Sequence, residues 1–174
     1  MALGVCLLFD TRSARALRDL WSRLEAAGIA TLATHTHGRH HPHLSYVVLL
    51  DWDVDAVHAA VAALPDHGPF EITFDALAAF RRGRVSLVPA PAADLLTRQQ
   101  AVVRAVSGTG ARVHRHYALD RWLPHSSVAT RSATRELPAV ASLVYEILPL
   151  TVRVTSAALI DSATGRTWTL PVLP

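Results

Sequence analysis

The apolar positions of this chain recur with two spacings, and these spacings predict where its helices and strands lie. Stretches with apolar residues three and four apart predict amphipathic helices, whereas short apolar or alternating stretches between turn residues predict strands. The predicted strands cover 2–9, 43–50, 70–80, 85–89, 150–160 and 167–173, and one more strand is opened by His125. The predicted helices run from 11 to 27, from the capping residue Asp53 to Pro65, from 92 to 106 and from 138 to 147.

The order of these elements repeats. The first series is a strand, a helix, a histidine-bearing strand, a helix and strands. The second series is a helix, a second histidine-bearing strand, a helix and a terminal strand pair. Helices in such units cover one face of a mainly antiparallel sheet. No linker rich in proline, glycine or serine separates the halves. We therefore predict an α+β fold with helices on its outer faces, in which two lobes pack as one body over 1–174.

Both histidine-bearing strands open with the pattern Pro-His-x-Ser, once at 42–45 and once at 124–127. Because side chains alternate along a strand, the histidine and the serine of each copy should share one face. The four side chains concerned are His43, Ser45, His125 and Ser127. Chance also produces such a pattern in a chain with ten histidines, so the alternative is structural histidines that never meet.

The basic residues exclude two classes of phosphate chemistry. All 17 are arginine, and the chain has no lysine. A Walker-type phosphate-binding loop and a ligase that forms a lysyl-adenylate both need lysine. The net charge of +3 permits a small anionic ligand or a nucleic-acid end, but does not indicate a broad duplex-binding surface.

Hydropathy and cysteine usage suggest the compartment. No apolar run approaches the roughly 18–20 residues that span a bilayer, so we expect no membrane partner. The apolar start of the chain, cut short by Asp10, is typical of a buried strand and not of a signal peptide. The single cysteine, Cys6, excludes an internal disulfide and predicts a small core residue in a reducing cytoplasm.

The two motifs carry a resemblance to a known family. Through the motif at residues 42–45 and the segment at residues 122–127, the chain resembles the two-histidine (2H) phosphoesterase superfamily. The resemblance is strongest to its bacterial 2′-5′ RNA ligase-like and RNA 2′,3′-cyclic phosphodiesterase members. The resemblance implies two pseudo-twofold lobes around a central cleft that carries both motifs. It also implies metal-independent cleavage or re-formation of phosphodiesters at ribose, without a cofactor. The chain departs from the family pattern in having serine for threonine, a polar Ser126, and Arg131 one position later than the usual arginine.

The residue types fit that chemistry. Histidine can give or take a proton near neutral pH, so His43 and His125 can act as an acid–base pair on opposite sides of phosphorus. Ser45 and Ser127 can donate hydrogen bonds to the non-bridging phosphate oxygens. The expected substrates are nucleotides or RNA with a 2′,3′-cyclic phosphate or a 2′-5′ linkage. Which histidine is the base stays open, as do the direction of reaction in the cell and the oligomeric state.

Several other residues are candidates with a structural alternative. The histidine-rich loop at 35–41 suits either a metal site or a mobile loop at the cleft mouth, where Arg39 would contact phosphate. Trp122 suits base stacking or core packing, and Tyr117, beside His114 and His116, suits base contact or a buried role. Arg131 is a further candidate for phosphate contact. The arginine run at 81–84 suits either an RNA backbone or solvent.

Three functions therefore remain as hypotheses. The first is a two-histidine cyclic phosphodiesterase. The second is a binding module of the same fold that holds a nucleotide or an RNA end without turnover. The third is a histidine-rich metal-binding protein.

Overall fold

The strands form one antiparallel sheet whose order is mirrored about its centre. The structure is a computed structural model that describes residues 2–90 and 92–174, and within these residues the sheet has eight strands. The strands are β1 (Leu3–Phe9), β2 (His43–Asp51), β3 (Phe70–Phe80), β4 (Arg84–Pro89), β5 (Arg112–Val113), β6 (Ser126–Ala129), β7 (Leu150–Asp161) and β8 (Thr167–Thr169). Their order is β5-β2-β1-β7-β3-β4-β6, with β8 paired to β7.

The helices complete a repeat that the sequence predicts. They are α1 (Thr11–Ala26), α2 (Val54–Ala62), α3 (Ala93–Ser107) and α4 (Leu137–Tyr145). The chain order is β1-α1-β2-α2-β3 and then, apart from the short β5, β4-α3-β6-α4-β7. The sheet order mirrors these units, because β3 and β7 pair at the centre, β1 and β4 lie outside them, and β2 and β6 lie farther out. Each half of the chain therefore gives its last strand to the other lobe.

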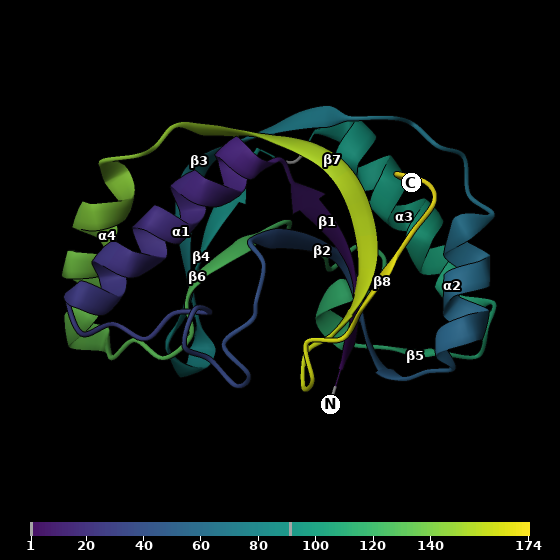
Figure 1. Cartoon of the computed structure of the whole chain (residues 1–174), viewed down its shortest axis with the longest axis horizontal. Helices are drawn as coiled ribbons and strands as arrows, with labels where there is room; N and C mark the ends of the chain where they lie inside the picture. Colours follow the sequence, from purple (N-terminus) through teal and green to yellow (C-terminus); the bar gives the residue numbers. More distant parts are fainter. Residues whose placement is uncertain (1, 91) are drawn as a thin grey trace.

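Two helix pairs cover the outer faces, as predicted (Figure 1). Helix α1 packs on α4 and contacts β6, whereas α3 packs on α2 and contacts β2. The pleat of β1 separates the two faces of the sheet. Leu3, Val5 and Leu7 join the main core under the helices. Cys6 and the partly buried Leu8 belong to a separate small apolar cluster on the opposite face.

Both helices of the first half begin where side-chain caps satisfy their backbone. The carboxylate of Asp10 accepts a hydrogen bond from the Ser13 N–H at 2.7 Å, at the start of α1. The carboxylate of Asp53 accepts from the N–H groups of Asp55 and Ala56 at 2.9 and 3.0 Å, as predicted for α2. Such a cap contributes about 1 kcal/mol to stability.

The predicted terminal strand at 167–173 is too long. β8 ends at Thr169, because Pro171 has no N–H to continue the ladder and because Leu170 and Leu173 turn into the core. A short edge strand, β5, is present on β2 where none was predicted. No helix within residues 2–90 and 92–174 combines the length and the apolarity needed to cross a membrane.

Candidate active site

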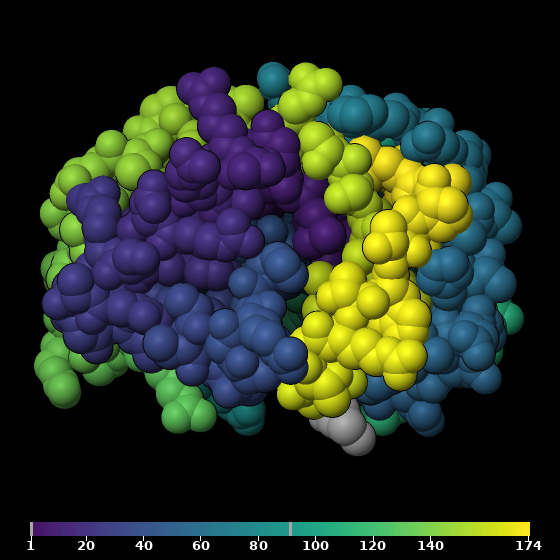
Figure 2. All heavy atoms as spheres, viewed as in Figure 1, coloured from purple at the N-terminus to yellow at the C-terminus, as the bar shows by residue number. Residues whose placement is uncertain are grey.

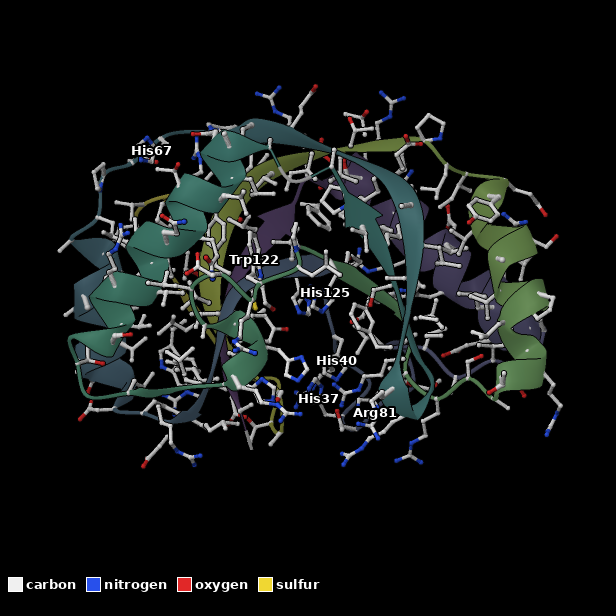
Figure 3. The ribbon with its side chains drawn as sticks, turned by 180° about the vertical axis from the view of Figure 1, so that it is seen from behind. His37, His40, His67, Arg81, Trp122 and His125 are labelled. Carbon is white, nitrogen blue, oxygen red and sulfur yellow. The ribbon has the colours of Figure 1, made fainter. Side chains whose placement is uncertain are left out.

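The two Pro-His-x-Ser motifs lie at the starts of strands that contact each other. β2 and β6 are in contact, and the indole N–H of Trp122 donates a hydrogen bond to the Ser45 carbonyl at 3.1 Å. The segment before the second motif is thus bonded to the first motif. Figure 3 shows His125 and Trp122 in the central space between the helix pairs. The charge of His43 lowers the pKa of His125, in agreement with the contact between β2 and β6.

Both histidines are held by the same hydrogen bond. The Nδ1 atom of His43 bonds the carbonyl oxygen of His41 at 2.6 Å, and that of His125 bonds the carbonyl oxygen of Leu123 at 2.8 Å. A carbonyl oxygen only accepts, so Nδ1 carries a proton and Nε2 is the nitrogen that can exchange one. The residue between histidine and carbonyl is proline in both motifs, which fixes the local backbone.

The serines stand where both strands carry a bulge. In the pairing of β2 with β1, Ser45 lies opposite Cys6 and the register then shifts at Tyr46 and Val47. In the pairing of β6 with β4, Ser127 lies opposite Ser86 and the register again shifts directly afterwards. Bulges are frequent beside active sites because they re-aim side chains. Strand alternation puts the histidine and serine on one face, and after the bulge the following residues are buried in the core.

An indole N–H anchors the backbone of each motif. Trp122 donates to the Ser45 carbonyl, and Trp21, from α1, donates to the Ser127 carbonyl at 3.2 Å. The Trp122 ring also packs against that of Tyr46, with ring centroids 6.0 Å apart. Trp122 therefore has a structural role, and base stacking by its exposed part stays a prediction.

Cys6 is the neighbour that distinguishes the first motif. Its Sγ lies 3.4 Å from the Ser45 Oγ, and a Cβ at Gly4 would come within 2.8 Å of that sulfur, so glycine gives the thiol its room. Burial opposes the charged form of His43, but the Cys6 sulfur and the His41 carbonyl outweigh burial and raise the pKa of His43 to about 9. The imidazole of the first motif is therefore protonated near neutral pH.

Two aromatic rings and an arginine distinguish the second motif. The His125 ring lies between Phe80 and Tyr117, with centroid distances of 5.3 and 6.1 Å. Burial lowers the pKa of His125, the charges of His43 and Arg84 lower it further, and the hydrogen bond to Leu123 only partly opposes them. The imidazole of the second motif is therefore neutral near neutral pH.

The remaining candidates lie at different distances from this pair. Tyr117 is beside His125, and burial together with Cys6 raises its pKa to about 12 against the opposing effect of Arg84, so its phenol stays protonated. The charge of Arg131 acts on His35. The guanidinium of Arg39 donates a hydrogen bond to the Thr164 carbonyl at 3.2 Å, in the turn between β7 and β8.

The histidine-rich loop packs against that turn. The ring of His37 packs so closely on Gly165 that a Cβ there would lie 2.7 Å from the His37 Cε1 atom. The ring centroids of His37 and His40 are 4.1 Å apart. Figure 2 shows this part of the chain meeting the β7–β8 turn, with a hollow beside the contact. In the described part of the chain, no group of three His, Cys, Asp or Glu residues is placed to hold a metal ion. The loop thus gives no structural support to a metal site.

Sequence reasoning missed Cys6 and Arg84 as neighbours of the histidines. Cys6 is buried, as predicted for a core residue, but it faces the motif side of β1 and not the main core. Arg84 comes from β4, whereas the resemblance directs attention to Arg131, after the second motif. The pairing of β1 with β2 reveals Cys6, and the charge that acts on His125 reveals Arg84; neither follows from a pattern within one strand.

Comparison with known proteins gives one family and several related folds. The sequence profile of the 2′-5′ RNA ligase superfamily matches residues 10–166. Similar solved structures include Escherichia coli LigT complexed with NADP+ (15% identity, TM-score 0.63, 98% of this chain and 94% of that chain). They also include Kluyveromyces marxianus Usb1 with uridine monophosphate (12%, 0.55, 98% of each chain) and the MHV ns2 PDE domain (13%, 0.55, 97% of each chain). A search of curated protein sequences gives no match.

Proposed function

Because the chain belongs to the 2′-5′ RNA ligase superfamily, we propose that it is a metal-independent phosphodiesterase of the two-histidine type. The family is the one that the two motifs predict. The proposed substrates are nucleotides or RNA that carry a 2′,3′-cyclic phosphate or a 2′-5′ linkage. The proposed compartment is the cytoplasm, because the one cysteine of the chain is a free thiol.

The observation that carries this proposal is that two strands in contact have, at their starts, histidines held in the same way through Nδ1, in surroundings that shift their pKa values in opposite directions. When the environments of two titratable groups push their pKa values apart, the pair has an acid and a base. His43, with a pKa raised to about 9, has the proton to give. His125, with a lowered pKa, has a free Nε2 to accept one.

These states assign the steps of ring opening. The Nε2 of His125 takes a proton from water as the water oxygen forms its bond to phosphorus. The bond from phosphorus to one ribose oxygen breaks, and His43 gives its proton to that oxygen. The product is a nucleoside monophosphate, and proton exchange with solvent restores both rings. Each proton transfer contributes on the order of 10²–10⁴ in rate, and neither needs a metal or a covalent intermediate.

Neighbouring hydroxyls would hold the phosphate. Ser45 and Ser127 lie two residues beyond the histidines and can donate to the non-bridging oxygens, where charge develops. The protonated phenol of Tyr117 is a third donor beside His125. Trp122, Arg39 and Arg131 are proposed contacts to the rest of the substrate. Nucleotides bind to relatives of this fold, since solved structures of LigT contain 3′-AMP or ATP.

A panel of nucleoside 2′,3′-cyclic phosphates, assayed with and without a chelator, tests the proposal. We expect turnover to a nucleoside monophosphate at the same rate in both conditions. Loss of turnover in the chelator would refute metal independence. Binding of the cyclic nucleotides without turnover would instead support the binding module, which the serines in place of threonines keep as the second candidate.

A further inference from the structure

A group of exposed arginines lies at one edge of the second lobe. Arg81 and Arg82 are at the tip of the β3–β4 hairpin, Arg84 begins β4, and Arg131 follows β6. Within residues 2–90 and 92–174, the arginines in ion pairs with carboxylates are Arg23 and Arg98. The charges of the four exposed arginines are therefore available for another partner. The cationic rim is the name used here for Arg81, Arg82, Arg84 and Arg131.

The rim is a fixed surface because its two segments are bonded together. The Ser132 N–H donates to the Gly83 carbonyl at 2.7 Å, and a Cβ on Gly83 would lie 2.3 Å from the Ser132 carbonyl oxygen. Only glycine permits this approach. The hairpin tip and the segment after β6 therefore present their arginines side by side.

The backbone of Arg82 is in a conformation that a glycine or asparagine adopts more easily. Its φ is 66° and its ψ 28°, in the left-handed region, and the following Gly83 has a φ of 70°. A non-glycine residue held there is strained, and such outliers cluster at ligand-binding sites. The tight turn of the hairpin holds Arg82 in this conformation, so its side chain has a fixed starting direction at the tip.

The rim is electrostatically continuous with the active site. Arg84 lowers the pKa of His125, and Arg84 and Arg131 together lower that of His35. Arg131 is six residues from His125, so it lies within about 20 Å of the catalytic histidine. Figure 3 shows Arg81 on the same side of the central space as His37 and His40.

We propose that the cationic rim binds the phosphate backbone of a single-stranded oligonucleotide whose terminal phosphate lies between the two histidines. This inference rests on the proposed function and names its substrate class as oligonucleotide in preference to mononucleotide. Guanidinium groups match phosphate in charge and geometry. A mononucleotide cyclic phosphate has a single phosphate, whereas an oligonucleotide has further phosphates that can contact the arginines at the tip of the β3–β4 hairpin.

The charges near the rim indicate where the phosphates bind. A cavity of about 300 Å³ adjoins Arg131 and is lined by Thr31, Thr34, His35, Thr36 and Thr130. Behind it, the carboxylate of Glu25 accepts hydrogen bonds from Thr31 and Thr34 at 2.7 and 2.8 Å, and would repel a phosphate. The phosphates therefore lie along the arginines and not inside this cavity.

Fluorescence anisotropy with a labelled single-stranded oligoribonucleotide ending in a 3′-phosphate tests the rim, because this probe is not hydrolysed by ring opening. Arg82→Gly suits the test, since glycine favours the left-handed backbone. We expect Arg82→Gly and Arg131→Gln each to weaken binding about threefold to tenfold in low salt. Each should also reduce the slope of log K against log salt by roughly 0.7 for a single strand. Arg104→Gln, on the exposed face of α3, is the matched control and should bind the probe like the wild type.

Hydrolysis of two substrates completes the test. The ratio of kcat/KM for an oligonucleotide 2′,3′-cyclic phosphate to that for a cyclic mononucleotide should fall in both rim variants. Unchanged binding and an unchanged ratio would overturn the inference, as would a wild type that binds the oligonucleotide no more tightly than a nucleoside monophosphate. The wild type could bind the probe more tightly than the rim variants do and yet hydrolyse neither substrate. This result would refute the proposed function and support oligonucleotide binding by the cationic rim.

Discussion

The two halves of the candidate site have nearly the same backbone and different neighbours. Each motif has a proline, a histidine bonded through Nδ1 to the second carbonyl before it, a bulge after the serine, and an indole N–H on the serine carbonyl. The adjacent strand places Cys6 opposite the first serine and Ser86 opposite the second. The repeated backbone thus aims two imidazoles in the same way.

The neighbours give these imidazoles opposite tasks. The Cys6 sulfur favours the proton on His43 against the effect of burial, whereas burial and the charges of His43 and Arg84 disfavour a proton on His125. Duplication supplies two equivalent groups, and an acid–base pair needs two unequal ones. The difference teaches that the proposed catalysis would depend on residues outside the repeated motif.

The largest expected effect comes from removing either histidine. His43→Ala and His125→Ala should each lower kcat/KM for a cyclic phosphate at least about 100-fold, because each removes one proton transfer. The wild type should show a bell-shaped pH profile. Its activity rises as His125 loses its proton below pH 6.5, and falls as His43 loses its proton at a pH of about 9.

The variants should divide that profile between them. The residual activity of His125→Ala should lack the acidic limb, and that of His43→Ala should lack the alkaline limb. His67→Ala, at the outer edge of the molecule (Figure 3), is the control and should keep the whole profile. If the alkaline limb were lost in His125→Ala and not in His43→Ala, the proposed roles of acid and base would have to be exchanged.

Exchanging the two strand neighbours should have a smaller effect. In Cys6→Ser the first motif acquires the neighbour of the second, so the pKa of His43 should move from about 9 toward 6.5. Activity at pH 8 should then fall about tenfold or more, with little change near pH 6.5, because less His43 holds a proton. NMR titration of the His43 ring measures this pKa without relying on turnover.

The groups that face His43 bear on this result. They are Cys6 on β1, the neighbouring rings of His40 and His41, and His125 across the site. The mirrored variant Ser86→Cys should leave the His43 midpoint in place. Equal His43 midpoints in the wild type and Cys6→Ser would show that the sulfur does not set the difference between the motifs.

Much of the scaffold could be predicted from the chain alone. Helix spacing located all four helices, Asp53 was identified as a cap, and the repeated order of elements matches the mirrored sheet. These features depend on neighbours within a few residues, so local patterns contain them. The predicted end of β8 is wrong because the apolar pattern continues past Pro171, whose missing N–H ends the ladder.

The protonation of the site could not be predicted in the same way. Cys6, which contacts Ser45, is 39 residues from it, and Arg84, whose charge lowers the pKa of His125, is 41 residues from it, so both effects depend on how distant strands pair. The strand that carries each motif has a bulge, which shifts its register with the neighbouring strand. In the sequence this bulge is visible only as two adjacent apolar residues, such as Tyr46 and Val47. Sequence could name the two histidines, but not which of them keeps its proton.

The smallest expected effect comes from Arg84, the weaker of the two charges that favour a neutral His125. Arg84→Gln should move the acidic limb for a cyclic mononucleotide upward by roughly a few tenths of a pH unit, because an exposed guanidinium is screened by solvent. The shift should shrink in about 1 M salt, where the Debye length is about 3 Å. Arg104→Gln should leave both limbs in place. Since Arg84 is not among the groups that shift His43, the alkaline limb should stay at its wild-type pH, and movement of both limbs together would mean that the two motifs do not have separate environments.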